Sequence, residues 1–179
     1  MKIGIVIPAH NEEHYLSACL QSIQVAIDNI SGYEVEVIVV LDNCTDQSRL
    51  IVQSHQINWI ECNYACVGQA RDLGIRHLIR RGVTWIACTD ADTVVSPDWL
   101  RYQIQHQPTD AICGTVTLDD FSHLSITKQQ KYLAHYKDQM DHAHIHGANL
   151  SFSAEVYLLV GGFEPISCHE DVSLIKKLI

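Results

Sequence analysis

Two patterns of hydrophobic and polar positions alternate along the chain. Continuous apolar runs are typical of strands buried on both faces of a parallel sheet. These runs predict strands at 2–7, 34–41, 57–62, 83–89, 111–118 and 145–153. Apolar residues spaced three or four positions apart are typical of helices that cover a core with one face. This spacing predicts helices at 12–29, 45–55, 67–81, 97–106, 125–141, 154–160 and 170–179.

Polar residues stand where several of the predicted helices begin. A side-chain oxygen just before a helix can accept a hydrogen bond from a backbone N–H of the first turn. We therefore expect such caps at four positions, which are Asn11, Thr45, Ser96 and Ser153.

The regular alternation of strands and helices predicts an α/β fold. We expect a Rossmann-like, mostly parallel central sheet flanked by helices on both faces. The length of 179 residues fits one domain, 1–179, with a sizeable core. In such sheets ligands bind outside the carboxyl ends of the strands, so the loops that follow the strands are the candidate sites.

The composition restricts the partners. Twelve basic and 21 acidic residues give a formal net charge of −9. This balance argues against nucleic acid as the main partner, because binding to a phosphate backbone needs clustered Lys and Arg. If the protein binds an anionic ligand, something local must supply positive charge.

The cysteines and the chain start indicate a cytoplasmic protein. Seven cysteines, an odd number, imply no disulfide framework and suit a reducing compartment. Cys62 and Cys66 lie close in sequence, but free thiols fit them better than a zinc site does. The apolar run before Pro8 is too short for a signal peptide. No stretch approaches the roughly 20 apolar residues of a transmembrane segment.

The loops after the first, second and fourth strands carry six acidic residues. They are Glu12, Glu13, Asp42, Asp46, Asp90 and Asp92. The sequence has no Walker A loop and no GxGxxG after the first strand, which disfavours P-loop enzymes and dehydrogenases. Carboxylates can instead bind a diphosphate through Mg²⁺ or Mn²⁺. The alternative is that Asp90 and Asp92 are turn and cap residues before Ser96.

Six segments in order resemble one enzyme family. They are IPAHNEE (7–13), VIVVLDNCTDQS (37–48), VGQARDLGI (67–75), TDADTVVSPDWL (89–100), HGANLSFSAEVYLLVGGF (146–163) and HEDVSL (169–174). Together they resemble the inverting glycosyltransferases of family 2, which have the GT-A fold. The fourth segment resembles the DxD motif of that family, and the sixth resembles its Glu-Asp motif.

The resemblance implies roles for particular residues. It implies a nucleotide-sugar site at Pro8, Ala9, His10, Glu12, Asp42, Arg71, Asp90 and Ala91. Asp92 and Asp90 would be the metal residues, with Asp92 as the main ligand and Asp90 also holding the ribose. Asp171 would be the general base, with Glu170 beside it. The acceptor side would be bordered by Gly147, Ala148, Asn149 and His169.

The implied reaction is an inverting transfer of a sugar from a nucleoside diphosphate to a hydroxyl acceptor, with Mn²⁺ or Mg²⁺ as cofactor. A UDP-sugar is preferred to a GDP-sugar, and the acceptor is a saccharide, a lipid-linked molecule or a small molecule. Residues 1–95 would bind the nucleotide and 96–179 would form the acceptor side. One alternative is a catalytically reduced sugar-nucleotide-binding or scaffold domain. A sugar nucleotidyltransferase is less favoured, because no Gly-rich loop with Arg and Lys follows the first strand.

Two features depart from the family pattern. Asp72 stands where the family usually has Asn, so it either adds negative charge near the diphosphate or turns outward and caps the helix start. The chain ends at Ile179, whereas family members normally continue beyond the Glu-Asp motif. We therefore expect a truncated domain or a reduced form.

A histidine cluster and a Cys-His pair admit other chemistry. On a strand, His142, His144 and His146 would share one face, as three metal ligands do. The alternative is a solvated or acceptor-lining stretch. Cys168 and His169 are adjacent, which disfavours a nucleophile–base pair because neighbouring side chains rarely point at each other.

Overall fold

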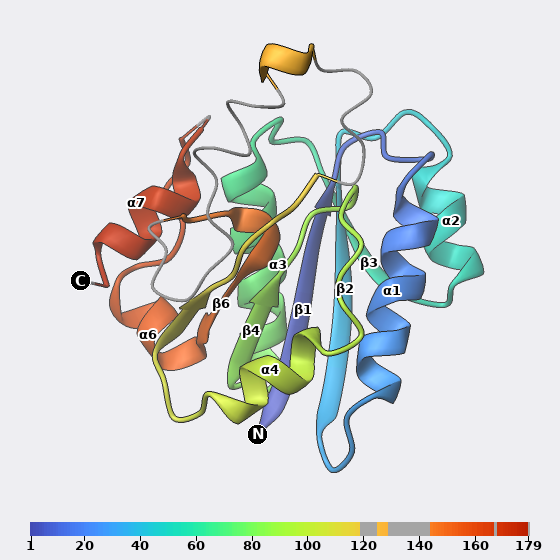
Figure 1. Ribbon diagram of the computed structural model, residues 1–179. Coiled ribbons are helices and arrows are strands. Elements are labelled where there is room, and N and C mark those ends of the chain that lie inside the picture. The colour runs from blue at the N-terminus through green and yellow to red at the C-terminus, as the bar shows by residue number, and fades with distance from the viewer. Residues whose placement is uncertain (119–124, 129–143, 167, 179) are drawn as a thin grey trace.

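The structure is a computed structural model of the chain, and it describes residues 1–118, 125–128, 144–166 and 168–178. A central sheet carries helices on both faces (Figure 1). Its strands are β1 (Lys2–Ala9), β2 (Glu34–Asp42), β3 (Asn58–Cys62), β4 (Trp85–Cys88), β5 (Ala111–Cys113) and β6 (Leu150–Ser153). The strand order is β3-β2-β1-β4-β6-β5. Strands β1 to β4 pair in parallel, while β6 pairs antiparallel with β4 and β5, so the predicted mostly parallel sheet is confirmed.

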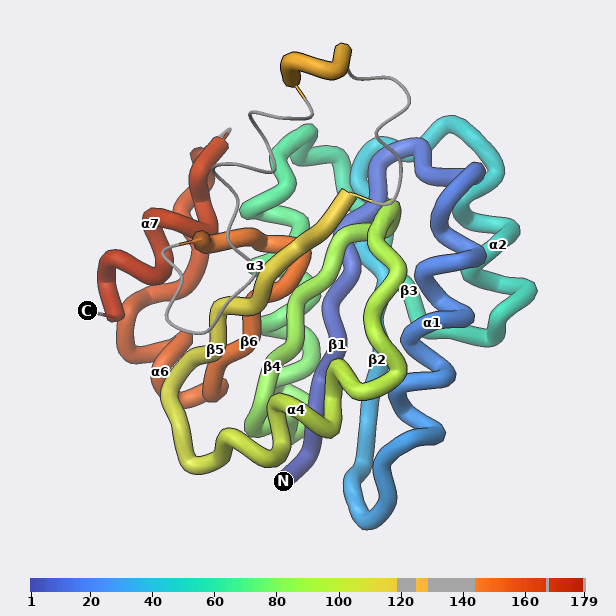
Figure 2. Tube along the Cα trace, viewed as in Figure 1, coloured from blue at the N-terminus to red at the C-terminus, as the bar shows by residue number. Residues whose placement is uncertain are grey.

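The helices divide between the two faces of the sheet (Figures 1 and 2). They are α1 (Leu16–Asp28), α2 (Ser48–Ser54), α3 (Val67–Arg80), α4 (Trp99–Gln105), α6 (Ala154–Leu159) and α7 (Glu170–Lys176). Apolar residues of α1, α2 and α4 join one core cluster, and those of α3, α6 and α7 join the other. Within the described residues, no helix combines the length and apolar character needed to cross a bilayer.

Strand β1 shows why the apolar runs predict buried strands. Ile3, Ile5 and Ile7 belong to the core cluster on one face of the sheet, and Val6 belongs to the cluster on the other face. Since successive side chains of a strand point to opposite faces, a strand covered on both faces needs apolar residues throughout.

Two predicted strands form over less than half of their expected length. The run at 111–118 forms a strand only at Ala111–Cys113. The run at 145–153 begins with a 3₁₀ turn, η1 (Gly147–Asn149), and becomes a strand at Leu150. The N–H of Asn149 donates to the carbonyl of His146 (2.9 Å), so this segment curls before it joins the sheet. The predicted helix at 125–141 lies outside the described residues except for 125–128.

One of the predicted helix caps is confirmed and three are wrong. Ser153 Oγ accepts a hydrogen bond from the N–H of Val156 (3.1 Å) and caps α6. Asn11, Thr45 and Ser96 do not cap the helices as observed, which begin two to four residues later than predicted, although Ser96 Oγ accepts from the N–H of Asp98 (3.3 Å) in the turn before α4. Asn11 Oδ1 instead accepts from the N–H of Thr45 (2.8 Å), which joins two loops.

Helix α3 lies unusually close to the sheet at Gly74. A Cβ atom there would lie 2.5 Å from Val6 Cγ2 and 2.8 Å from Val40 Cγ2. Gly74 therefore allows α3 to approach β1 and β2. Arg71 lies one turn earlier on the same helix, so the close approach brings Arg71 near the carboxyl ends of these strands.

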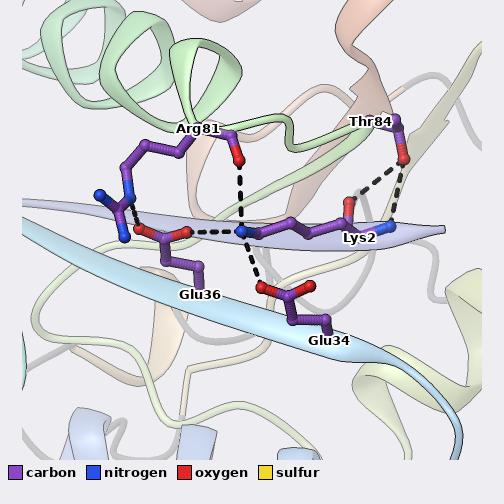
Figure 3. A network of polar contacts seen from close by, with 5 residues as sticks. All are labelled: Lys2, Glu34, Glu36, Arg81 and Thr84. Carbon is purple, nitrogen blue, oxygen red and sulfur yellow. Dashed lines mark hydrogen bonds and ion pairs between the residues drawn. The ribbon is translucent and has the colours of Figure 1, made fainter.

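A polar network lies at the amino-terminal ends of β1 and β2, opposite the strand ends that carry the acidic loops (Figure 3). Lys2 Nζ pairs with Glu34 (2.8 Å) and Glu36 (3.1 Å) and donates to the carbonyl of Arg81 (3.2 Å). Arg81 also pairs with Glu36, and the backbone N–H of Lys2 donates to Thr84 Oγ1 (3.2 Å). These bonds tie the end of α3 and the start of β4 to β1 and β2.

The Gly74→Ala substitution is expected to destabilise the protein. Overpacking against Val6 and Val40 costs about 1–3 kcal/mol, of which the better helix propensity of Ala offsets up to about 1 kcal/mol. Urea unfolding measures the change. Arg80→Ala, at an exposed position of the same helix, is the control and should change the free energy of unfolding little. An equal effect of both variants would contradict the close approach of α3.

Glu36→Gln is expected to lower the free energy of unfolding by about 1 kcal/mol at neutral pH. Burial raises the pKa of Glu36, but hydrogen bonds from Lys2 and Arg81 outweigh burial and lower the pKa below its ordinary value of 4.5. A carboxylate with a lowered pKa stabilises the fold above its unfolded pKa, and this contribution disappears as the pH falls through the folded value.

The difference between wild type and Glu36→Gln should therefore be full at neutral pH and shrink below pH 4.5. Urea unfolding across this range measures it. Glu34→Gln is the control, because Glu34 is mostly exposed and pairs with Lys2 alone among the described residues. A difference that grows in acid would contradict the proposed role of the network.

Candidate active site

A cavity of about 670 Å³ opens at the carboxyl edge of the parallel strands. This is the upper edge of the sheet in Figure 1. The loops after β1, β2 and β4 form one part of its wall, and the start of α3, η1 and the start of α7 form the rest. The cavity therefore lies where the strand-end rule places a ligand.

All the residues for which the sequence predicts a site role line this cavity except Asn149 and His169. Asn149 Oδ1 accepts from Trp99 Nε1 (2.9 Å), and its amide nitrogen donates to the carbonyl of Thr115 (2.9 Å). These bonds use Asn149 to hold neighbouring segments together. His169 is exposed and precedes α7 with a left-handed backbone (φ +60°), so it supports the helix start from outside the cavity.

The structure adds six lining residues outside the predicted site set, although the sequence pattern admits Cys66 as a zinc ligand and His146 as a metal ligand or part of an acceptor-lining stretch. They are Ala65, Cys66, Val67, Ala70, Val116 and His146. The first three follow β3, where the strand-end rule already points, but their small or apolar side chains carry no chemical signal. Val116 and His146 come from runs predicted as regular strands, and their true irregular path brings them to the cavity.

Arg71 is the central cation of the site. Its side chain is 3% exposed and forms ion pairs with Asp90 Oδ1 and Glu170 Oε1. Its guanidinium carbon lies 6.0 Å from the centre of the Phe163 ring. A Cβ atom on Gly147 would come within 2.4 Å of Arg71 Nη1, so the absence of a side chain at residue 147 makes room for the guanidinium.

The ion pairs of Arg71 join three elements. Arg71 lies on α3, Asp90 follows β4, and Glu170 begins α7. Burial lowers the pKa of Arg71, but the charges of Asp90 and Glu170 outweigh burial and raise it. The positive charge is therefore retained and used within the protein to fix the two carboxylates.

Asp171 is fixed by backbone hydrogen bonds. Its Oδ2 accepts from the N–H of Gly147 (2.8 Å), and its Oδ1 accepts from the N–H of Val172 (2.7 Å). The neighbouring Glu170 points to Arg71. The two acidic residues at the start of α7 both line the cavity but differ in their contacts, since Glu170 pairs with a buried cation and Asp171 accepts from backbone N–H groups.

Asp42 organises the loop between β3 and α3. Its side chain is buried, and Oδ1 accepts from the N–H groups of Tyr64 (2.7 Å) and Ala65 (3.1 Å). Its Oδ2 accepts from the N–H of Cys66 (3.0 Å) at the start of α3. These three bonds stabilise a buried charge and fix the cavity wall.

Acidic side chains form one rim of the cavity. Burial raises the pKa of Glu12, and the negative charges of Asp92, Asp46 and Asp90 raise it further. Asp92 is exposed, and no described residue forms a hydrogen bond or ion pair with it. Carboxylate oxygens of this kind are the donors that Mg²⁺ and Mn²⁺ prefer.

No group of three or more metal-binding side chains occurs in the part of the chain that the structure describes. Cys62 and Cys66 form no disulfide. The rings of His144 and His146 stack with centroids 5.9 Å apart, on a segment that is not a strand. His142 lies outside the described residues.

Asp72 faces away from the cavity. It accepts hydrogen bonds from Arg76 Nε (2.7 Å) and from the hydroxyl of Tyr157 (2.7 Å). Of the two expectations for this residue, the outward orientation is confirmed. The predicted cap at the helix start is wrong, because Asp72 pairs instead with Arg76 one turn later.

Comparison with known sequences identifies a family. The model described as "Glycosyl transferase family 2" matches residues 4–157. A similar curated protein is the glycosyltransferase GlyA of Streptococcus pneumoniae serotype 4, which is 31% identical over 105 residues. That match covers 56% of this chain and 14% of GlyA.

Solved structures share the fold over almost the whole chain. Staphylococcus aureus TarS 1–349 in complex with UDP-GlcNAc is 16% identical with a TM-score of 0.72, and the match covers 99% of this chain and 53% of TarS 1–349. The mannosyltransferase PcManGT of Pyrobaculum calidifontis, in complex with GDP-Man and Mn²⁺, is 17% identical with a TM-score of 0.68 and coverages of 98% and 51%.

The chain thus spans about half the length of these solved relatives and a smaller part of GlyA. The likeness confirms the GT-A fold. Because the family model covers most of the chain, the chain belongs to glycosyl transferase family 2.

Proposed function

We propose that the chain carries the donor site and the catalytic base of an inverting glycosyltransferase that uses a nucleoside diphosphate sugar and a divalent cation. The observation that carries this proposal is the pairing of two carboxylates in one cavity. Asp92 offers oxygens that no described residue occupies, and Asp171 is held rigidly by two backbone N–H groups. One carboxylate suits a cation and the other suits proton transfer.

The residues present fit a cation bound together with the donor. Mg²⁺ and Mn²⁺ are commonly held by one or two carboxylates plus substrate phosphates, so a cluster of three protein ligands is not required. Asp92 would provide the main ligand. The bound cation would neutralise the diphosphate and stabilise the charge that develops on it as it leaves.

Arg71 and Glu170 would act by positioning. Arg71 holds one oxygen of Asp90, so the other carboxylate oxygen can accept a hydrogen bond from a ribose hydroxyl of the donor. Glu170 fixes Arg71 from the opposite side and orients the start of α7. This arrangement keeps Asp171 at a constant place relative to Asp90.

Asp171 would be the general base. Its carboxylate takes the proton of the acceptor hydroxyl while the hydroxyl oxygen forms a bond to the anomeric carbon. The bond from that carbon to the diphosphate oxygen breaks at the opposite face, so the nucleoside diphosphate leaves with the electron pair and the configuration inverts. No protonated partner for the leaving group is needed.

The donor end of the cavity would lie within residues 1–95 and the acceptor side within 96–179. Asp42 and His10 would border the base, and Pro8, Ala9 and Ala91 would line the nucleotide. A UDP-sugar is the preferred donor, like the UDP-GlcNAc in the TarS complex, and a GDP-sugar is the alternative, like the GDP-Man in the PcManGT complex. The acceptor would be a hydroxyl-bearing saccharide, lipid-linked molecule or small molecule bordered by Gly147 and Ala148.

Asp92→Asn is expected to weaken the binding of UDP in the presence of Mn²⁺ roughly tenfold or more, because it removes the main carboxylate ligand. Isothermal titration with Mn²⁺, and separately with EDTA, measures the effect. Asp28→Asn is the control, since Asp28 is exposed and lies at the far end of α1. Equal binding by wild type and Asp92→Asn would remove the cation from the proposal, and titration with GDP tests the preferred base.

Asp171→Asn is expected to slow turnover of the donor by roughly a hundredfold or more without weakening nucleotide binding, because the amide cannot accept the proton. Release of UDP from UDP-sugars, with water or added saccharides as acceptor, measures turnover. Asp110→Asn, an exposed change of the same kind, is the control. An unchanged rate in Asp171→Asn would reject Asp171 as the base, and nucleotide binding without turnover by the wild type would favour the binding-domain alternative.

A further inference from the structure

The loops that follow β1 and β2 hold each other through a reciprocal set of hydrogen bonds, which we name the loop clasp (residues 11–13 with 44–48). Three consecutive backbone N–H groups of the first loop donate to side chains of the second. Asn11 donates to Cys44 Sγ (3.4 Å), Glu12 to Ser48 Oγ (2.9 Å) and Glu13 to Asp46 Oδ2 (2.9 Å).

The second loop returns hydrogen bonds to the first. The N–H of Thr45 donates to Asn11 Oδ1 (2.8 Å), and the N–H of Gln47 donates to Glu13 Oε2 (3.0 Å). Each loop thus supplies acceptors for backbone groups that the other loop would leave unsatisfied. The N–H groups of Glu12 and Glu13 donate at partly buried positions, where an unsatisfied backbone group is costly, so the first loop depends on the second for its conformation.

Asp46 uses both carboxylate oxygens in the clasp. Oδ2 accepts from Glu13, as described, while Oδ1 accepts from the N–H of Ser48 (3.0 Å) at the first turn of α2. Burial raises the pKa of Asp46, but hydrogen bonds from Ser48 and Glu13 outweigh burial and lower it. The residue is therefore held as an anion by donors from both loops.

The clasp determines where Glu12 lies. Its backbone N–H is bound by Ser48, which is fully buried and is itself oriented by Asp46. The next backbone N–H, of Glu13, is bound by Asp46 directly. The side chain of Glu12 lines the cavity near Asp92 and Asp90. Neither Asp46 nor Ser48 lines the cavity, so any effect of theirs on a ligand passes through the first loop.

We propose that Asp46 is a positioning residue that holds Glu12 at the donor cavity, so that tight nucleotide binding depends on a side chain that does not touch the ligand. This inference rests on the proposed function, because it concerns the same cavity. A residue that capped α2 alone would need one oxygen, whereas Asp46 uses its second oxygen on the loop that carries Glu12.

Asp46→Asn tests the proposal with an almost isosteric change. The amide keeps one acceptor but places a donor against either Glu13 N–H or Ser48 N–H. The dissociation constant of the Mn²⁺ complex of UDP is expected to rise roughly tenfold, as for loss of a buried hydrogen bond, while Asp28→Asn leaves it unchanged. The direction is diagnostic. This complex carries net negative charge, so removing a nearby negative charge would by itself strengthen binding.

A double-mutant cycle separates positioning from a loss of stability. Urea unfolding first shows that each variant is folded in buffer, and nucleotide binding is then measured under those conditions. If Asp46 acts through Glu12, Asp46→Asn adds little to the loss already caused by Glu12→Gln, and the two effects are not additive. Ser48→Ala, which removes the acceptor for the Glu12 N–H, should weaken nucleotide binding as Asp46→Asn does. Ser48→Thr, which keeps the hydroxyl, should bind more tightly than Ser48→Ala. These second variants also decide the matter if Asp46→Asn does not fold.

Amide hydrogen exchange provides a readout that needs no ligand. Asp46→Asn should speed exchange at Asn11, Glu12 and Glu13 relative to Asp28→Asn, because it loosens the first loop. If wild type binds nucleotide and Asp46→Asn binds equally well, the positioning role is overturned. If wild type binds neither UDP nor GDP, the proposed function fails. In that case hydrogen exchange tests the loop clasp without a ligand. Unchanged exchange rates in Asp46→Asn would overturn the role of Asp46 in the loop clasp, and faster rates would support it.

Discussion

The site depends on the burial of one guanidinium. Removing an arginine side chain from water is expensive, and Arg71 is stable at 3% exposure because Asp90 and Glu170 both pair with it. The cost of leaving a buried charge unpaired makes the three side chains interdependent. Since they come from α3, the loop after β4 and the start of α7, the pairing fixes these elements relative to one another. Asp171 is the next residue after Glu170, so its position is fixed as well.

The same pairing explains the electrostatic character of the cavity. Arg71 forms ion pairs with two carboxylates, so its positive charge does not neutralise the negative charges of Glu12 and Asp92 on the rim. Burial raises the pKa of Glu12, and this surplus of negative charge raises it further. Under the proposed function, a divalent cation bound with the anionic donor would offset this negative charge and the net charge of −9. The acidic composition and the acidic cavity thus lead to the same chemical requirement.

The sequence predicts the elements of this fold whose cause is local. The apolar runs of β1 and β2 have residues for both faces, and Ser153 caps the helix that directly follows it. The strand-end rule also finds Asp42, which ends β2, and Asp90 and Asp92, which lie in the loop after β4. The sequence fails where the partner is distant. Asn11 looks like a cap but bonds to Thr45, 34 residues away. Asn149 looks like a site residue, but Trp99 and the Thr115 carbonyl engage it.

Asp42 shows how the separate anchors become one site. Its backbone carbonyl accepts a hydrogen bond from His10 Nδ1 (2.7 Å), which fixes the imidazole tautomer with its proton on that nitrogen. Its carboxylate meanwhile holds the loop that begins α3, the helix that carries Arg71. One residue therefore connects the loop clasp on one face of the sheet to the buried ion pairs on the other. The hydrogen bonds of Asp42 therefore help to set the shape of the cavity that it lines.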